Sequence, residues 1–344
     1  MTNIYYSPNY IKKYNIYDIF YNDINQLIII IPAEKDPFII KYCLPNDNSL
    51  NFNICKVPVN SCKNGHIYIY SLEIEYSENI RLNINNDIIE TYVNKYPILT
   101  NEIILSTMVK YDDNIIKQWI DFHLKLGFTK IVIYDNKNSP DMEIVSFNRD
   151  PKRNIIKESI LEILLKDYIT NNSVILIKWD YSKYLEISNI SGQIAQQNHS
   201  IYAFNTAKYI GLFDVDEYIN IQEKLNIDDF LNNYIFNNNI NINTISSFRL
   251  LNKFFYNPEN KQIIDNNFLY IFNCDNITKQ GHEKNIVIPK NVKMYYIHRV
   301  FLPRDNMITI DDKLIFFNHY YYLNKHNRGR NNTTIIDKSI IKHL

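Results

Sequence analysis

The segment that decides the fold is Lys208–Ile219, with the sequence KYIGLFDVDEYI. Its apolar run Tyr209–Phe213 is typical of a strand buried in a parallel sheet, and it ends abruptly at two aspartates. Side chains two positions apart in an extended chain point to the same side, so Asp214 and Asp216 are expected to project together, with Val215 facing the core. A divalent cation would relieve the repulsion between the two carboxylates, and oxygen ligands suit manganese or magnesium. The structural alternative is a solvated acidic turn.

The composition indicates a globular protein without an affinity for nucleic acid. The chain has 344 residues, of which 46% are hydrophobic and 22% charged, enough for one large domain or two ordinary ones. Lysine plus arginine and aspartate plus glutamate both number 37, so no basic field favours nucleic acid.

Targeting and cysteine signals are weak. There is no charged-then-apolar secretory signal and no apolar run long enough to span a bilayer, so we expect a cytoplasmic location and no transmembrane segment. The four cysteines show neither CxxC spacing nor a zinc pattern: Cys43, Cys55, Cys62 and Cys274.

Strand-like runs rich in Ile and Tyr dominate residues 1–97, where Pro, Asn, Asp and Gly separate them. We therefore predict a small β-rich N-terminal domain that serves as a packing platform without chemistry of its own. Residues 98–330 are predicted to form the main domain, and residues 331–344 a C-terminal tail.

From Ile98 the pattern alternates between strands and helices. The expected strands are Glu102–Val109, Lys130–Tyr134, Val174–Trp179 and Tyr209–Phe213, and the expected helices follow Asp112 or Asp113 and span about 155–168 and 190–208. This alternation predicts an α/β fold with an open, mostly parallel sheet and flanking helices. Ligands bind outside the carboxyl ends of such strands, so Asp135 and the Asp214 pair should share one edge.

A series of motifs over about residues 102–330 resembles glycosyltransferase family 92 and its bacterial relatives in the family 2-like group. The matching pieces, in chain order, are Val109-Lys110 through Trp119-Ile120 and His123, Leu126-Gly127, Tyr134-Asp135-Asn136 with Ser139 and Asp141, Gln193 to Asn198, Phe213-Asp-Val-Asp-Glu-Tyr-Ile, Lys284-Asn-Ile-Val-Ile-Pro followed by His298, and His319-Tyr320 with Lys325 and Arg328-Gly329. The sequence departs from the family pattern at Tyr111-Asp112, Gln118 and Ile288, and these departures spare the aspartate pair.

The resemblance implies a GT-A fold with a DxD motif and transfer of a sugar from a nucleotide-sugar, a UDP-sugar, to a hydroxyl acceptor on a glycan, protein or lipid. It also implies an inverting hexosyltransferase of glycan biosynthesis that requires Mn²⁺ or Mg²⁺. The expected metal group includes both aspartates: Asp216 is expected to ligate the metal directly, and Asp214 to reach the donor ribose or a metal-bound water. His319 is expected to be a third ligand, with His298 as the alternative.

The resemblance implies donor-binding roles for Lys110, Asp135, Asn136, Asp214, Lys284, Lys325 and Arg328. A carboxylate is expected to deprotonate the acceptor, so the predicted catalytic set is Asp214, Asp216 and Glu283, with Asp265 and Asp275 as other candidates for the base. Two other classes stay open. A nucleotidyltransferase can use the same aspartate pair, and a non-catalytic sugar- or partner-binding protein could use the β-rich domain.

Overall fold

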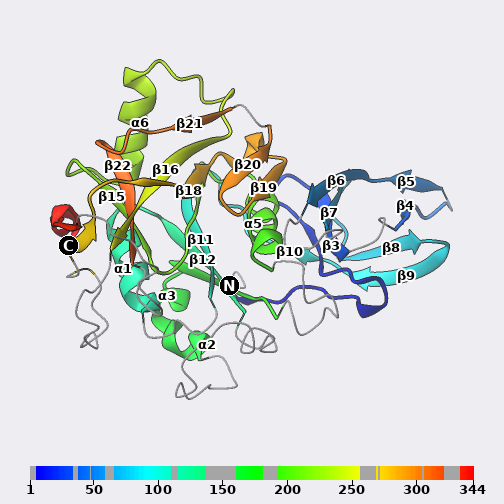
Figure 1. Cartoon of the computed structure of the whole chain (residues 1–344). Coiled ribbons are helices and arrows are strands. Elements are labelled where there is room, and N and C mark those ends of the chain that lie inside the picture. Colours follow the sequence, from blue (N-terminus) through cyan, green and yellow to red (C-terminus); the bar gives the residue numbers. More distant parts are fainter. Residues whose placement is uncertain are drawn as a thin grey trace.

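The structure is a computed structural model, and it describes residues 5–33, 38–46, 48–58, 66–109, 115–136, 160–180, 192–255, 269, 272–303, 306–320 and 334–344. Its central feature is a twelve-stranded sheet (Figure 1). The main path of this sheet is β1 (Tyr5–Tyr6), β13 (Val174–Lys178), β12 (Lys130–Asp135), β11 (Ile103–Val109), β14 (Tyr209–Leu212), β18 (Lys279–Val287), β16 (Ser247–Phe255), β17 (Asn273–Asp275) and β23 (Thr334–Ile336). Off this path, β15 (Glu217–Ile221) pairs with β22 (Ile315–Tyr320), and both β22 and β21 (Met307–Thr309) pair with β16.

The sheet is mixed, which corrects the expectation of a mostly parallel one. Along the path from β1 to β14 the neighbouring strands are parallel, and β16 is parallel to β21 and β22. The antiparallel pairs are β14–β18, β16–β18, β16–β17, β17–β23 and β15–β22. Parallel neighbours need a crossover connection, usually a helix, and the helical pattern of the sequence fades after β14. The four strands predicted for the first half are confirmed, with ends that differ by one residue.

The helices cover both faces of the parallel half. The helices are α1 (Ile116–Lys125), α2 (Leu161–Leu164), α3 (Lys166–Thr170), α5 (Gly192–Ala203) and α6 (Ile227–Asn237), with 3₁₀ turns η1 (Lys12–Tyr14), η5 (Pro289–Asn291) and η6 (Ser339–His343). The side chains of β11 alternate between the two faces of the sheet. Leu105 joins the core that holds Trp119 of α1, while Ile104 joins the core that holds Ile194 of α5. Gly127 ends α1 with a φ of +107°, a conformation that favours glycine.

The N-terminal segment forms two further sheets. One sheet has the order β10 (Asn94–Lys95), β2 (Asp18–Tyr21), β3 (Gln26–Ala33), β7 (His66–Glu73) and β6 (Asn53–Pro58), and the other β5 (Ser49–Asn51), β4 (Ile40–Cys43), β8 (Asn79–Ile84) and β9 (Asp87–Tyr92). Strand β3 is an unbroken apolar run because both its faces are buried: Ile29 packs between the two sheets, and Ile28 packs toward α5. Figure 1 shows α5 between these sheets and the central sheet.

The N-terminal segment and the central sheet share one hydrophobic core. Phe20 and Ile28 belong to the same buried cluster as Val132 and Ile210 of the central sheet. In addition, β1 lies at the edge of the central sheet, where it pairs in parallel with β13. The division at residue 97 stays a prediction about folding units, but the two parts are not structurally independent.

The end of the chain is also part of this packing. Strand β23 pairs with β17, and Ile340 of η6 is fully buried. Lys253 of β16 contacts Asp337 at 2.7 Å, and His343 contacts the carbonyl oxygen of Ile221 at 2.8 Å. Residues 334–344 therefore pack on the central sheet, where the sequence had suggested a tail.

Candidate active site

The residues after β14 form a turn instead of continuing as a strand. The backbone N–H of Glu217 donates to the carbonyl oxygen of Asp214 (3.1 Å), and the N–H of Asp214 donates to Oε2 of Glu217 (2.9 Å). Val215 faces the core, as expected. However, the alternation of an extended strand does not apply here, so Asp214 and Asp216 contact different partners. The reason is that pairing with β11 ends at Leu212, one residue before the turn.

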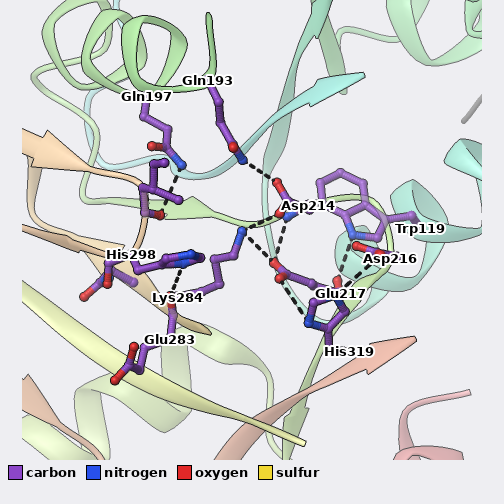
Figure 2. Close-up of polar contacts among 12 residues, drawn as sticks. Trp119, Gln193, Gln197, Asp214, Asp216, Glu217, Glu283, Lys284, His298 and His319 are labelled. Atoms are coloured by element: carbon purple, nitrogen blue, oxygen red, sulfur yellow. Dashed lines mark hydrogen bonds and ion pairs between the residues drawn. The ribbon is translucent and has the colours of Figure 1, made fainter. Parts of the chain in front are cut away.

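Lys284 lies beneath this turn with its side chain only 1% exposed. Its Nζ is 2.6 Å from Oδ2 of Asp214 and 3.1 Å from Oε2 of Glu217 (Figure 2). Burial opposes the charge of the ammonium, but the two carboxylates outweigh it and raise the pKa of Lys284 above its usual range. Strand β18 brings Lys284 here by pairing antiparallel with β14.

Asp214 is held from two sides. Nε2 of Gln193, from the first turn of α5, donates to Oδ1 of Asp214 at 2.8 Å, while Lys284 binds Oδ2. Burial raises the pKa of Asp214, but the charge and hydrogen bond of Lys284 outweigh that effect and lower it below its ordinary value. The side chain keeps 40% of its surface exposed, so the carboxylate is oriented but still accessible.

Asp216, Glu217 and His319 form a group with the geometry of a metal site. The potential ligand atoms of these three residues all lie within 4.8 Å of one another. The pairing of β15 with β22 places Glu217 opposite His319. His319 Nε2 lies 3.5 Å from Oδ2 of Asp216, and its Nδ1 lies 3.8 Å from Oε1 of Glu217.

The charges of this group fit a cation. Burial and the nearby charges of Asp214 and Asp216 outweigh Lys284 and His319, and together they raise the pKa of Glu217 to about 7. Burial favours neutral His319, but Asp216 and Glu217 outweigh it and raise its pKa. Two carboxylates and an imidazole are donors that Mn²⁺ accepts, and a bound cation would relieve the repulsion that shifts Glu217. The residues present therefore fit a divalent metal.

Neighbouring elements hold this group in place. The indole N–H of Trp119, on α1, donates to the carbonyl oxygen of Glu217 at 2.9 Å. The backbone N–H of Tyr320 donates to the carbonyl oxygen of Asp216 at 2.8 Å. The ring of His319 stacks on Phe254 of β16 with centroids 4.9 Å apart.

His298 lies near Asp214 but outside the three-residue group. It sits in the connection between β19 (Met294–Tyr296) and β20 (Arg299–Leu302), and its Nδ1 lies 3.1 Å from the carbonyl oxygen of Glu283. Burial and the charge of Lys284 lower the pKa of His298 to about 4. Asp214 interacts electrostatically with both His298 and His319.

The carboxylates considered as the base lie in other surroundings. Glu283 directs its carboxylate toward Arg249 (4.0 Å), and Figure 2 shows it pointing away from Asp214. Asp275 is buried against Lys279 at 2.5 Å, and Asp265 is outside the described residues.

Some of the predicted donor-binding residues lie at the edge of the sheet, and the others lie outside the described residues. Asp135 and Asn136 lie at the carboxyl end of β12, buried to 6% and 8% exposure, and Asp135 is in register with Val109 at the end of β11. The turn that carries Asp214 follows β14 at the same edge. Lys110, Lys325 and Arg328 lie outside the described residues.

Sequence reasoning missed two functional candidates. Glu217 was considered only as part of the segment around the two aspartates, although the apolar residues that follow it, Tyr218, Ile219 and Ile221, indicated a new strand. Asp180 follows β13 at the same sheet edge as Asp135 and is 8% exposed. Its position after a buried apolar strand was the available signal.

Comparison with known protein families identifies the family of this chain. The model of glycosyltransferase family 92 matches residues 155–344, which is more than half of the chain, and the chain therefore belongs to this family. No curated protein matches the sequence. A solved structure of the bifunctional glycosyltransferase WbbM in its apo form aligns over 48% of this chain and 27% of that one, with 11% identity and a TM-score of 0.29. Within the described part of the chain, every helix is too short or too polar to cross a membrane.

Proposed function

We propose that this protein is a metal-dependent GT-A glycosyltransferase that transfers the sugar of a UDP-sugar to a hydroxyl of a glycan, protein or lipid acceptor. The observation that carries the proposal is the group of Asp216, Glu217 and His319 beside the Lys284-bound Asp214, at the carboxyl edge of the parallel strands. Membership of the family supports sugar transfer, and ligands of open α/β sheets bind at this edge.

Asp216, Glu217 and His319 are the proposed ligands of Mn²⁺, or of Mg²⁺. An imidazole among oxygen ligands favours manganese. A divalent metal in this position supplies Lewis-acid stabilisation of the charge that develops on the departing UDP. Asp214, with both carboxylate oxygens held by Gln193 and Lys284, is proposed to orient the donor instead of ligating the metal directly.

The donor is proposed to lie along the strand ends. Asp135 and Asn136 would accept and donate hydrogen bonds to uracil or ribose, and the exposed part of Asp214 would accept a ribose hydroxyl. The buried Lys284 contributes by keeping Asp214 ionised and fixed. Contacts of Lys110, Lys325 and Arg328 with the diphosphate stay predictions.

A thermal-shift screen tests this proposal. UDP-, GDP- and CMP-sugars are added to the full chain, each with Mn²⁺ or with EDTA. The expected result is stabilisation by UDP-sugars that requires Mn²⁺, with about 2.7 kcal/mol at 100 times the dissociation constant. Equal responses to every nucleotide-sugar, or to UDP-sugars with and without the metal, would contradict the donor and metal assignments.

A further inference from the structure

An inverting sugar transfer needs a group that takes the proton of the acceptor hydroxyl. Among the described residues, the carboxylates first considered for this role are engaged elsewhere: Glu283 faces Arg249, and Asp275 contacts Lys279. Asp216 and Glu217 belong to the proposed metal group. These contacts direct attention to a proton acceptor of another kind near Asp214.

The orientation of the His298 ring determines which of its nitrogens can accept a proton. Nδ1 lies 3.1 Å from the carbonyl oxygen of Glu283, and a carbonyl oxygen can only accept a hydrogen bond. Nδ1 therefore carries the hydrogen, and Nε2 of the neutral ring has a free lone pair. Within the part of the chain that the structure describes, Nε2 has no hydrogen-bond partner, and the side chain is only partly buried.

The backbone around His298 is fixed on two sides. Nδ2 of Asn285, on β18, donates to the carbonyl oxygen of His298 at 2.8 Å. Asn198 of α5 makes two hydrogen bonds to the backbone of Tyr295, one to its N–H (3.0 Å) and one to its carbonyl oxygen (2.8 Å). Between these anchors Ile297 adopts a φ of +26°, a left-handed conformation that is costly for a β-branched residue. The fold thus holds the imidazole in one place at a cost in local strain.

The charged groups that face His298 keep its ring neutral at physiological pH. They are Lys284 and His282 of β18, which disfavour the charged form together with burial, and Asp214, which favours it. The resulting pKa of about 4 is in the range of a carboxylate. His298 is therefore unprotonated where a glycosyltransferase would be assayed.

We propose that Nε2 of His298 is the general base that accepts the proton of the acceptor hydroxyl, an inference that rests on the proposed function. Figure 2 shows His298 and His319 on opposite sides of Lys284 and Asp214. With the diphosphate at the proposed metal group, the sugar and the acceptor would lie on the side of His298.

The proposed step is a single displacement at the anomeric carbon. The acceptor oxygen forms a bond to the anomeric carbon, and the bond from that carbon to the diphosphate oxygen breaks. The electron pair of that bond leaves with UDP, and the hydroxyl proton moves to Nε2. Asp214 stabilises the imidazolium that forms, and the partly exposed ring then returns the proton to solvent.

The test compares His298→Gln with His282→Gln and Glu283→Gln in the full chain. His282 is the matched control, because its ring lies 5.7 Å from that of His298 on the neighbouring strand. Release of UDP is measured with UDP-glucose, UDP-galactose and UDP-N-acetylglucosamine, Mn²⁺ and water as acceptor. Binding of UDP and Mn²⁺ is measured separately by thermal shift.

We expect His298→Gln to lower kcat by about 100-fold or more while UDP and Mn²⁺ binding stays within twofold of wild type. The His282→Gln control should keep most of the wild-type rate, and imidazole should partly restore turnover by His298→Ala. Retention of more than half of the rate by His298→Gln, loss of rate only in Glu283→Gln, or a parallel loss of metal binding would each overturn the inference. Absence of UDP release from the wild type would instead overturn the proposed function itself.

Discussion

Glu217 on β15 and His319 on β22 lie directly opposite each other, although 101 sequence positions separate them. Antiparallel pairing of the two strands therefore completes a site that begins at the turn after β14. Together with Asp216 they provide two carboxylates and an imidazole within 4.8 Å.

Removal of one of these ligands should weaken metal binding without unfolding the protein. Asp216→Asn and His319→Ala are each expected to abolish most of the Mn²⁺-dependent thermal stabilisation by UDP. Asp167→Asn, at an exposed position of α3, is the control and should behave as wild type. Isothermal titration of Mn²⁺ in the presence of UDP measures the effect directly. Unchanged Mn²⁺ affinity in both site variants would contradict the ligand assignment.

Replacement of Lys284 should destabilise the fold. Lys284→Met leaves the 1%-exposed Glu217 carboxylate and the half-buried Asp214 without their cation, and loss of a buried partner costs about 3 kcal/mol. Urea unfolding measures this loss. The double variant Lys284→Met, Glu217→Gln should recover part of it, because the buried uncompensated charge is gone. If the double variant is less stable than the single one, loss of the ion pairs of Lys284 is not the cause of the destabilisation.

The Asp18–His199 contact tests how strongly the N-terminal segment is joined to the central sheet. Asp18 of β2 lies 3.0 Å from Nε2 of His199 on α5, and both side chains are fully buried. Tyr96 also donates to Asp18, and Tyr134 lies 2.8 Å from the other ring nitrogen of His199. Asp18→Asn is expected to cost about 3 kcal/mol of unfolding free energy.

The control for this change is Asp87→Asn, which removes an exposed contact with Lys13 in the same N-terminal segment. Exposed pairs contribute about 0 to 1 kcal/mol, so the control should be nearly neutral. Similar losses in both variants, measured by urea unfolding, would show that burial of the Asp18 contact does not matter.

Acid should destabilise the protein through His123. Burial lowers the pKa of His123 to about 3, below its ordinary value of 6.5, so the native state holds the ring neutral. The contribution of the neutral His123 ring to the free energy of unfolding is therefore complete above about pH 6.5. It declines as the pH falls toward 3, by up to about 1.4 kcal/mol per pH unit. In His123→Phe this part of the pH dependence should vanish. Unfolding free energies at pH 7 and pH 5 measure it, and equal slopes in the two proteins would refute the assignment.

The local features of the site could be predicted from the sequence, but the contacts between residues on distant strands could not. Apolar runs that end in aspartate indicated the strand ends at Asp135 and Asp214, because buried parallel strands have a composition of their own. The role of Lys284 depends on the antiparallel pairing of β18 with β14, and that of Glu217 on the pairing of β15 with β22. Register between distant strands follows from the packing of the whole sheet, which local periodicity does not encode.

The same limit explains the N-terminal segment. Its strands were recognisable from Ile- and Tyr-rich runs, yet the fully buried Asp18 gave no signal of its partner in α5. An apolar face such as that of Phe20 packs equally well on its own sheet or on a neighbouring layer, and only the three-dimensional arrangement distinguishes the two.

Product analysis of a UDP-sugar incubated with the protein and Mn²⁺ tests the central claim most directly. The account predicts UDP together with the free or transferred sugar, with formation lost in EDTA and in Asp216→Asn. Formation of UMP and a sugar phosphate, or no reaction with any UDP-sugar in the presence of Mn²⁺ and acceptor hydroxyls, would contradict it.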